Sequence, residues 1–439
     1  MTRFEPCGPL RGGLHPPADK SISHRAAILA AMGEGATRVE SYLDSADTRS
    51  TLGAIAAVGA NVEERSADEG GISLEIEGVG LRGAAPAAID VGNAGTLLRI
   101  LPGWLAGQGG GAGTEKAVWT LDGDDSIRRR PVDRIAEPLR TMGAEVECRD
   151  GRLPPLRVAG AELTGAEHRL PIASAQVKSC LLLAGLLAEG RTTVVEPAIS
   201  RDHTERMLAA AGARLHRDGT SVTIEPPVSL ELGSLSVPGD FSSAAFWIVA
   251  AVLVGNSEVH LRGCNLNETR TGLLAILERM GAAVEIESAE EIGGEPLGDI
   301  LARHGPLRPT LVRGAEIPRA IDELPLVGLV ACFAEGETRV IDASELRHKE
   351  SDRIAALVAA LAALGADADE LPDGFLVRGT GGLRGGVIDA GGDHRMAMLG
   401  AVAGLVSREG VEVRGMEAAA VSYPGFERDL RSLLGRHIG

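Results

Sequence analysis

One structural unit recurs six times along this 439-residue chain, at spacings of roughly 70–80 residues. Each unit opens with a short strand-like piece carrying Leu-Arg-Gly or a variant. A polar cluster, an apolar helix of small residues and a β-branched strand follow. A second, amphipathic helix then ends at a glycine, which suits a helix C-cap. The units start near Leu10, Leu81, Leu156, Leu230, Leu311 and Leu383, and the second helices end near Gly59, Gly143, Gly212, Gly281, Gly365 and Gly435.

Two helices and several strands in each unit predict an α/β (α+β) protein in which helices pack against sheets. The chain is too long for one hydrophobic core, so two domains or a repeat array are expected. A net charge of −17 with only 3% aromatic residues argues against nucleic acid or an anionic membrane as a partner. The longest apolar run, Ala244 to Val254, is too short to cross a bilayer.

The five cysteines are scattered and show no metal-ligand or disulfide spacing, so no metal site is expected. The N-terminus lacks the basic and apolar regions of a signal peptide, which predicts a reducing cytoplasm as the compartment. Only four of the 44 basic residues are lysine. Lysine differs from arginine in being a compact, titratable point charge, so these positions are candidates for proton transfer or tight charge fitting. They are Lys20, Lys116, Lys178 and Lys349.

The stretch Asp19-Lys20-Ser21-Ile22-Ser23-His24-Arg25 places an ammonium, hydroxyls and a guanidinium at the start of a helix predicted over Arg25 to Met32. Asp19 or Ser21 can cap this helix, and a helix N-terminus favours an anion. Taken alone, the stretch is better explained as a capped, solvated helix start. The pattern recurs, however, because each first helix is preceded by Asp, Asn or Ser: Asp19, Asn93, Ser174, Asp240, Asp322 and Asp393.

Cationic residues also gather where the second helices begin, in Arg128–Arg130, Arg201–His203 and Arg347–Arg353. Cations at a helix start oppose the local dipole, which is unfavourable unless an anionic ligand is held there. The sequence therefore predicts a cleft for one or two multiply charged anions, such as phosphates and carboxylates. For Asp240 simple capping is the preferred interpretation. No phosphate-binding loop, dinucleotide fingerprint or nucleophile elbow occurs in the sequence.

Eight segments resemble the signatures of the 5-enolpyruvylshikimate-3-phosphate (EPSP) synthase family, in the family's order and over nearly the whole chain. The Ser174-Ala175-Gln176 segment and Arg201–Thr204 are most similar to the class II branch. The eight segments are Lys20–Arg25, Gly92–Thr96, Arg130-Pro131, Ser174–Ser179, Pro238–Asp240, Asp322-Glu323, Lys349–Arg353 and Asp393–Arg395.

Two alternatives compete with this resemblance. The sister enolpyruvyltransferase that acts on a UDP-aminosugar has the same fold, but it lacks Ser-Ile-Ser-His-Arg and uses a loop cysteine. No cysteine lies close to Arg130 in this sequence. A non-catalytic, anion-binding relative is the second alternative. Such a protein would have no use for the paired acids Asp322 and Glu350.

The resemblance implies a two-domain inverse α/β barrel with three repeated helix-strand units in each domain. The first domain would span residues 18–238, and the second would combine residues 1–17 with residues 239–439. A hinge is expected near Ala18 and Pro238. The active site would lie in a cleft between the domains, which close on the substrates.

The implied reaction transfers the enolpyruvyl group of phosphoenolpyruvate to the 5-hydroxyl of shikimate 3-phosphate and releases phosphate, in the shikimate pathway to aromatic amino acids. No metal or organic cofactor is implied, the partners are these two small molecules, and a monomer is expected. The resemblance assigns catalysis to Lys20, Asp322 and Glu350. It assigns shikimate 3-phosphate to Lys20, Ser21, Arg25, Ser174, Ala175, Gln176, Arg201, Asp322 and Lys349, and phosphoenolpyruvate to Lys20, Gly95, Arg130, Gln176, Arg353 and Arg395.

Gly95 bears on inhibition by glyphosate, which competes with phosphoenolpyruvate in this family. Tolerant class II members carry alanine at this position, whereas this chain combines a class II segment with the glycine of sensitive enzymes. A methyl group acts directly on the ligand, so the glycine predicts sensitivity. The segment Ala420–Pro424 lacks the active-site lysine that some members carry there. Either arginines replace that lysine or it is dispensable in this branch.

Overall fold

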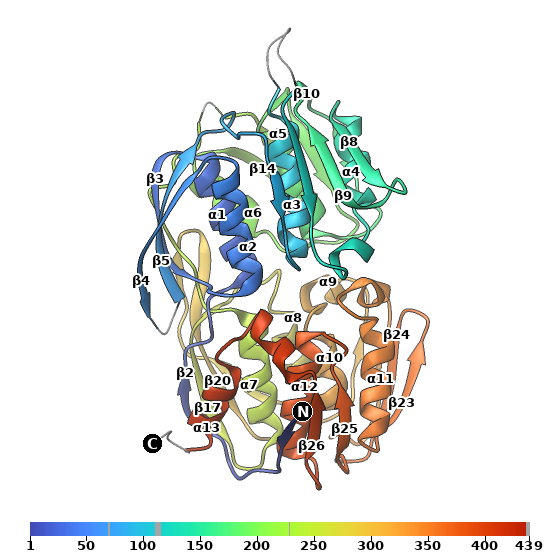
Figure 1. The fold of residues 1–439 in the computed structure, drawn as a ribbon. Helices are drawn as coiled ribbons and strands as arrows, with labels where there is room; N and C mark the ends of the chain where they lie inside the picture. The colour runs from blue at the N-terminus through green and yellow to red at the C-terminus, as the bar shows by residue number, and fades with distance from the viewer. Residues whose placement is uncertain (69–70, 110–115, 228, 436–439) are drawn as a thin grey trace. The chain divides into compact units, whose positions relative to one another are not determined.

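The computed structural model describes residues 1–68, 71–109, 116–227 and 229–435 (Figure 1). It divides into two compact units. The 18–237 unit comprises Ala18–Val237 and Ile292–Glu295, and the 238–439 unit comprises Met1–Pro17, Pro238–Glu291 and Pro296–Gly439. The short segment Ile292–Glu295 was expected in the other unit. It groups with residues 18–237 because Gly294 O accepts a hydrogen bond from Arg206 (3.0 Å) and Glu295 Oε1 lies 2.8 Å from His203 Nδ1. A hinge near Ala18 and Pro238 stays a prediction.

The described part of the 18–237 unit contains three four-stranded sheets with one strand order. In each, a short edge strand runs parallel to the strand that follows the first helix, and the remaining two strands run antiparallel. The sheets are β16 (Ser234–Ser236), β3 (Glu34–Tyr42), β5 (Gly71–Val79) and β4 (Asn61–Asp68); β6 (Ala88–Asp90), β7 (Val118–Asp122), β9 (Leu153–Ala159) and β8 (Glu145–Arg149); and β11 (Glu167–Arg169), β13 (Thr192–Val195), β15 (Ser221–Glu225) and β14 (Arg214–Asp218). A further pair joins β10 (Leu163–Thr164) to β12 (Ala188–Glu189).

The 238–439 unit repeats this order, and its first and third sheets borrow a strand from the N-terminus of the chain. The first contains β2 (Arg11–Leu14), β17 (Glu258–Asn265), β20 (Glu295–Arg303) and β18 (Ala283–Ile286), with β19 (Glu290–Ile292) beside β20. The second contains β21 (Leu311–Val312), β22 (Gly336–Val340), β24 (Gly374–Gly379) and β23 (Asp367–Leu371). The third contains β25 (Gly386–Asp389), β26 (Val411–Arg414) and β1 (Thr2–Phe4).

The first helix of each repeat is the buried element of that repeat. All of α7 is buried, as is α1 from Ile22 onward, whereas strands such as β5 and β15 bury one face only. Helices therefore form the inside of each unit and sheets the outside, which is the inverse of a barrel lined by strands. The predicted fold class with six helix-strand repeats is confirmed. The first helices are α1 (Lys20–Met32), α3 (Gly95–Ala106), α5 (Ala175–Gly185), α7 (Phe241–Leu253), α10 (Leu324–Ala331) and α12 (His394–Val406).

Small residues allow these inner helices to approach closely. At Gly103 of α3, a Cβ would lie 2.0 Å from the carbonyl oxygen of Cys180 in α5, so only glycine fits there. In the 238–439 unit α7, α10 and α12 pack against one another. No described helix is long and apolar enough to span a membrane.

The second helices end where the sequence predicts. Each is followed, directly after its C-cap residue, by one of the six predicted glycines in the left-handed conformation, with φ from +66° at Gly435 to +108° at Gly59. These helices are α2 (Ala46–Ala57), α4 (Asp133–Thr141), α6 (His203–Ala210), α8 (Gly272–Arg279), α11 (Arg353–Ala363) and α13 (Phe426–Leu433). The additional short helices are α9 (Glu316–Ala320), η1 (Ile127–Arg129), η2 (Ser344–His348) and η3 (Met416–Val421).

The helix starts differ from expectation in two respects. Helix α1 begins at Lys20 rather than at Arg25, and Asp19 caps it by accepting a hydrogen bond from Ile22 N (3.0 Å). Side chains cap α1, α5, α7 and α12, but α3 and α10 have Ala94 and Glu323 as N-caps without a side-chain cap bond. Asn93, the expected cap of α3, instead accepts a hydrogen bond from Arg130.

Candidate active site

The N-terminal turns of α3 and α5 meet in the 18–237 unit. Gln176 Nε2 donates to Thr96 Oγ1 (3.0 Å), and Gln176 Oε1 accepts from Arg99 Nη1 (3.0 Å). Ser174 caps α5 and Ala175 is its first residue, so these predicted substrate residues occupy the same turn. Helix N-termini carry partial positive charge, so this junction is suited to an anion.

Arg130 lies beside this junction. Its Nη2 donates to Asn93 Oδ1 (2.9 Å) and to Ser126 Oγ (3.1 Å), and the residue is 8% exposed. A Cβ at Gly95 would lie 2.9 Å from Arg130 Nη1 and 3.3 Å from Arg99 Nη1. The structure thus brings together Gly95, Arg130 and, through Arg99, Gln176.

Helix α1 presents Lys20 and, further inside, Arg25. The side chain of Lys20 is 18% exposed, and its Nζ donates to Asp47 Oδ2 (3.2 Å). Arg25 is buried, and its guanidinium donates to Thr204 Oγ1 (2.7 Å) and Ser179 Oγ (3.0 Å). These bonds connect α1 with α5 and α6.

The electrostatics around Arg25 leave it a cation at neutral pH. Burial lowers the pKa of Arg25 to about 10, and the negative charge of Glu205 is the largest influence that offsets burial. The positive charge of Arg201 lowers the pKa further, which places these two predicted substrate arginines within electrostatic reach of each other. Ser21 also contributes, since its carbonyl oxygen accepts from Arg25 Nη1 (2.9 Å).

His24 is the motif residue that burial has neutralised. Its Nδ1 lies 2.6 Å from Thr51 Oγ1. Burial, followed by the positive charges of Lys20 and Arg25, lowers the pKa of His24 to about 3. The imidazole is therefore neutral and serves the packing of α1.

The N-termini of α7, α10 and α12 meet in the 238–439 unit. Ser242, in the first turn of α7, donates to Glu323 Oε1 at the start of α10. Arg395, in the first turn of α12, donates from Nη1 to the carbonyl oxygen of Asp322 (3.3 Å), and the same nitrogen lies 3.6 Å from Glu323 Oε1. The partial positive charges of these three helix N-termini therefore lie close together, as those of α3 and α5 do in the 18–237 unit.

The Asp322 carboxylate lies among three cationic side chains. Lys349 Nζ is 3.4 Å from Asp322 Oδ1, Arg353 Nη1 is 3.2 Å from the same oxygen, and Arg395 Nη2 is 3.8 Å from Oδ2. The side chains of Lys349, Asp322 and Arg395 are 28%, 13% and 12% exposed, so this cluster reaches solvent. All the predicted residues of this unit come together here.

Arg353 is enclosed by carboxylates. Its Nε donates to Asp393 Oδ2 (2.8 Å), its Nη2 donates to Glu350, and its side chain is 1% exposed. Burial opposes the charge, but the carboxylates of Asp393, Glu350 and Asp322 raise the pKa of Arg353 above its ordinary value. Burial would likewise raise the pKa of Asp393, but the charges of Arg353 and His394 and the hydrogen bond from Arg353 together hold it below its ordinary value.

Several contacts of this site escaped the sequence analysis. Asp47 pairs with Lys20 across 27 residues, Arg99 with Gln176 across 77, and Asp393 with Arg353 across 40. The sequence predicts Asp393 as a helix cap only, because no local spacing indicates an ion pair between residues that are distant along the chain. Within the described ranges, no group of three or more His, Cys, Asp or Glu residues could hold a metal ion.

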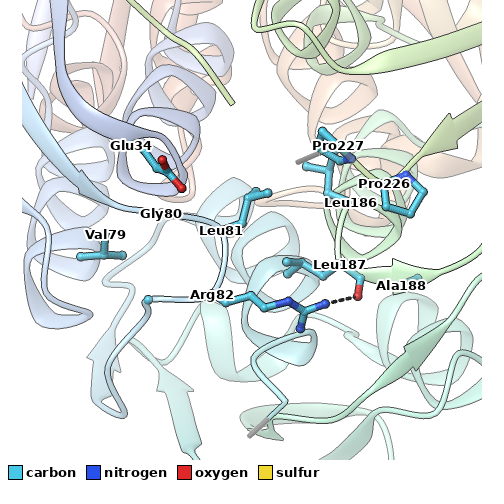
Figure 2. A pocket seen from close by; sticks show the side chains of 11 residues that line it. Glu34, Val79, Gly80, Leu81, Arg82, Leu186, Leu187, Ala188, Pro226 and Pro227 are labelled. Carbon is cyan, nitrogen blue, oxygen red and sulfur yellow. Dashed lines mark hydrogen bonds between the residues drawn. The ribbon is translucent and has the colours of Figure 1, made fainter. Parts of the chain in front are cut away.

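A separate hollow of about 490 Å³ lies elsewhere in the 18–237 unit (Figure 2). It lies at the C-terminal ends of α1 and α5, lined by Glu34 and by Leu186 to Ala188. Arg82 donates to the carbonyl oxygens of Gly107 (2.7 Å) and Leu187 (2.8 Å) there. Helix C-termini carry partial negative charge, so this hollow is a poor place for an anionic substrate.

The comparison with known proteins decides the family. The model of the family EPSP synthase (3-phosphoshikimate 1-carboxyvinyltransferase) matches residues 4–430. This chain belongs to the EPSP synthase family. The 3-phosphoshikimate 1-carboxyvinyltransferase of Prochlorococcus marinus (strain MIT 9303) is 46% identical over 432 residues, covering 97% of this chain and 96% of that protein. The protein of the same name from Methylococcus capsulatus is 45% identical over 431 residues, covering 98% and 96%.

A solved EPSP synthase from Acinetobacter baumannii is also similar to this chain. The two are 37% identical with a TM-score of 0.84, and the match covers 99% of this chain and 97% of that structure. The resemblance inferred from the motifs is thereby confirmed, together with the fold class and the enzyme class, an enolpyruvyl transferase. Membership in the EPSP synthase family sets aside the UDP-aminosugar enzyme and the non-catalytic relative.

Proposed function

We propose that this chain transfers the enolpyruvyl group of phosphoenolpyruvate to the 5-hydroxyl of shikimate 3-phosphate and releases phosphate, in the shikimate pathway to aromatic amino acids. The observation that carries this proposal is the Asp322 carboxylate among Lys349, Arg353 and Arg395, at the meeting point of helix N-termini. Both substrates are multiply charged anions. Cations and helix dipoles attract such anions even on a protein of net charge −17.

The binding roles follow the family assignment. Shikimate 3-phosphate is held by Lys20, Ser21, Arg25, Ser174, Ala175, Gln176, Arg201, Asp322 and Lys349. Phosphoenolpyruvate is held by Lys20, Gly95, Arg130, Gln176, Arg353 and Arg395. Planar guanidinium groups suit the carboxylate and phosphate of the second substrate because they form paired hydrogen bonds. Arg395 is the more accessible of its two arginines in the 238–439 unit.

The chemistry is an addition followed by an elimination. The 5-hydroxyl oxygen bonds to C2 of phosphoenolpyruvate as its proton leaves, and a second proton is added to the methylene carbon C3. The tetrahedral intermediate then loses phosphate from C2, and loss of a proton from C3 restores the double bond. We assign the proton transfers to Asp322 and Glu350 with assistance from Lys20, and the stabilisation of the departing phosphate to the arginines.

Shikimate 3-phosphate draws its proposed ligands from both units. We therefore infer that the units act as domains, residues 18–238 and residues 1–17 with 239–439, that close about a hinge near Ala18 and Pro238. A cytoplasmic monomer that works without metal or organic cofactor completes this proposal.

One assay tests the proposed reaction. Phosphate release from phosphoenolpyruvate is measured with shikimate 3-phosphate as acceptor and, separately, with a UDP-aminosugar. We expect release with the first acceptor only, and much slower release from Asp322→Asn, which keeps the shape of the side chain but removes its basicity. Release with the UDP-aminosugar alone, or with neither acceptor, would contradict the proposal.

A further inference from the structure

Lys178 is one of the four lysines of the chain and is not among the proposed substrate ligands or catalytic residues. It lies in α5 with a side-chain exposure of 0%. Its Nζ donates to Glu196 Oε2 (2.7 Å) and to the carbonyl oxygen of Ser200 (3.3 Å), and it lies 2.8 Å from Glu205 Oε1. Two of these oxygens accept hydrogen bonds from the ammonium group, and Glu205 contributes a nearby negative charge.

The same buried pair holds Ser200. Ser200 Oγ donates to Glu196 Oε1, and Ser200 N donates to Glu196 Oε2 (3.4 Å). With the bond from Lys178, the hydroxyl, the backbone N–H and the backbone carbonyl of Ser200 are all fixed. Arg201 is the next residue, so Lys178 and Glu196 determine where its backbone lies.

The network also supports Arg25. Ser179 and Thr204, which accept hydrogen bonds from Arg25, directly follow Lys178 and directly precede Glu205 in the sequence. Glu205 supplies the largest negative charge acting on Arg25. The buried cluster of Lys178, Glu196 and Glu205 therefore adjoins the residues that flank or contact both arginines proposed to hold shikimate 3-phosphate.

Buried ion pairs seldom add net stability, because desolvation of the charges offsets their attraction. Apolar residues of similar size could join α5 to α6 equally well. An ion cluster differs from an apolar contact in fixing direction, since Lys178 and Ser200 each donate a hydrogen bond to a particular oxygen of Glu196. This difference points to geometry as the contribution of Lys178.

We propose, on the basis of the proposed function, that Lys178 and Glu196 are positioning residues for shikimate 3-phosphate, fixing the backbone of Ser200 and Arg201 and, through the neighbouring Ser179 and Thr204, the place of Arg25. Neither residue touches the reacting atoms. The alternative is a role in holding the fold together without effect on the ligand.

The test uses Lys178→Met/Glu196→Gln in the full-length protein. This double substitution conserves side-chain size and leaves the net charge of the cluster unchanged, so it alters geometry without altering long-range attraction of the anion. We expect the Kd for shikimate 3-phosphate, measured by calorimetry, to rise at least tenfold, about 1.4 kcal/mol. The kcat with both substrates saturating, and the KM for phosphoenolpyruvate, should change less than about threefold.

Lys116→Met/Glu145→Gln is the matched control. It removes an exposed lysine–glutamate pair in the same unit by the same chemistry and should leave every constant unchanged. Ser200→Ala provides a second measurement if the double variant does not fold, since it removes one hydroxyl and no charge. It should raise the Kd for shikimate 3-phosphate by about threefold, the loss of a single buried hydrogen bond.

A purely structural role predicts a lower unfolding midpoint with an unchanged Kd, and that result would overturn the proposal. Equal losses in both substrate constants and in kcat would overturn it too, because they would indicate general loosening of the site. Failure of the wild-type protein to bind shikimate 3-phosphate would instead refute the proposed function. The two failures are therefore distinguishable.

Discussion

At the scale of single residues, the burial of His24 makes the free energy of unfolding depend on pH. The folded protein keeps its imidazole neutral down to about pH 3, whereas the unfolded chain has an ordinary histidine with a pKa of about 6.5. Between these values the unfolded state binds a proton that the folded state does not. The free energy of unfolding therefore falls as the pH falls below about 6.5.

His24→Asn keeps a polar group beside Thr51 and removes this titration. Relative to the variant, the wild type should lose about 1.4 kcal/mol of unfolding free energy for each pH unit below about 6.5. Urea unfolding of both proteins across this range provides the measurement. Parallel curves for the two proteins would mean that the pKa of His24 is not depressed.

Lys20 combines access to solvent with a hydrogen bond to Asp47. Lys20→Arg keeps the positive charge but replaces a compact ammonium with a larger planar group. We expect kcat/KM to fall by more than about 100-fold, a loss of about 3 kcal/mol in transition-state stabilisation. Lys116→Arg, the same exchange at an exposed lysine, serves as the control. Activity within a few-fold of wild type in Lys20→Arg would remove Lys20 from the chemistry.

The absence of a side chain at Gly95 leaves room for the guanidinium of Arg130. The wild type is expected to be inhibited by glyphosate, and Gly95→Ala should weaken inhibition by at least about tenfold, about 1.4 kcal/mol. The added methyl would lie 2.9 Å from Arg130 Nη1, so the guanidinium must shift. The KM for phosphoenolpyruvate should therefore rise as well, but by less. If both constants rose equally, the methyl would merely reduce the pocket without discriminating between the two ligands.

At the scale of elements, the C-terminal ends of the second helices could be predicted from the sequence because the signal that ends a helix is local. A glycine in the left-handed conformation after each C-cap needs only its neighbours to be recognised. The predicted start of α1 was wrong because Lys20 to Arg25 are polar apart from Ile22, and the continuous apolar pattern begins only at Ala26. Tertiary partners of Arg25 make those polar residues compatible with a buried helix.

Gly212 and Gly53 provide a matched pair for this argument. Neither would place a Cβ within 4 Å of any described neighbour, but Gly212 has φ +87° after α6 whereas Gly53 lies inside α2 with ordinary helical geometry. Gly212→Ala should destabilise the protein by about 1–2 kcal/mol through backbone strain. Gly53→Ala should stabilise it by about 0.5–1 kcal/mol. Thermal unfolding measures both, and equal effects would contradict the assignment of a C-cap to Gly212.

At the scale of the whole molecule, the six repeats, the fold class and the family were accessible to sequence analysis. The interior of the site was not. Two of the carboxylates that enclose Arg353, Glu350 and Asp322, belong to the same repeat as Arg353. Asp393 comes from the next repeat, and no spacing within one repeat encodes that contact. The residue types at the site could be predicted from the sequence, whereas the ion pairs and hydrogen bonds between them are evident only in the three-dimensional structure.

The proposed ligands of shikimate 3-phosphate belong to both units, as Arg25 and Lys349 illustrate. One molecule bound by both should draw the units together. Small-angle scattering is expected to show a smaller radius of gyration when shikimate 3-phosphate and glyphosate are added together. Lys349→Met should reduce the change. An unchanged radius at saturating ligand would indicate that the units do not move on binding.

Strands β1 and β2, which the N-terminal segment contributes to sheets of the 238–439 unit, affect how the protein folds during synthesis. The first sheet of the 18–237 unit closes with β16, so all its strands are present once residue 237 has left the ribosome. Strands β1 and β2, translated first, pair only with β26 and β17, which come later. At about 5–20 residues per second, the remaining 200 or so residues take about 10–40 s to synthesise. Strand β17 ends at Asn265, soon after residue 237, whereas β26 begins only at Val411. Strand β1 therefore lacks its final partner for most of that interval, and the charge of its Arg3 limits mispairing with other chains.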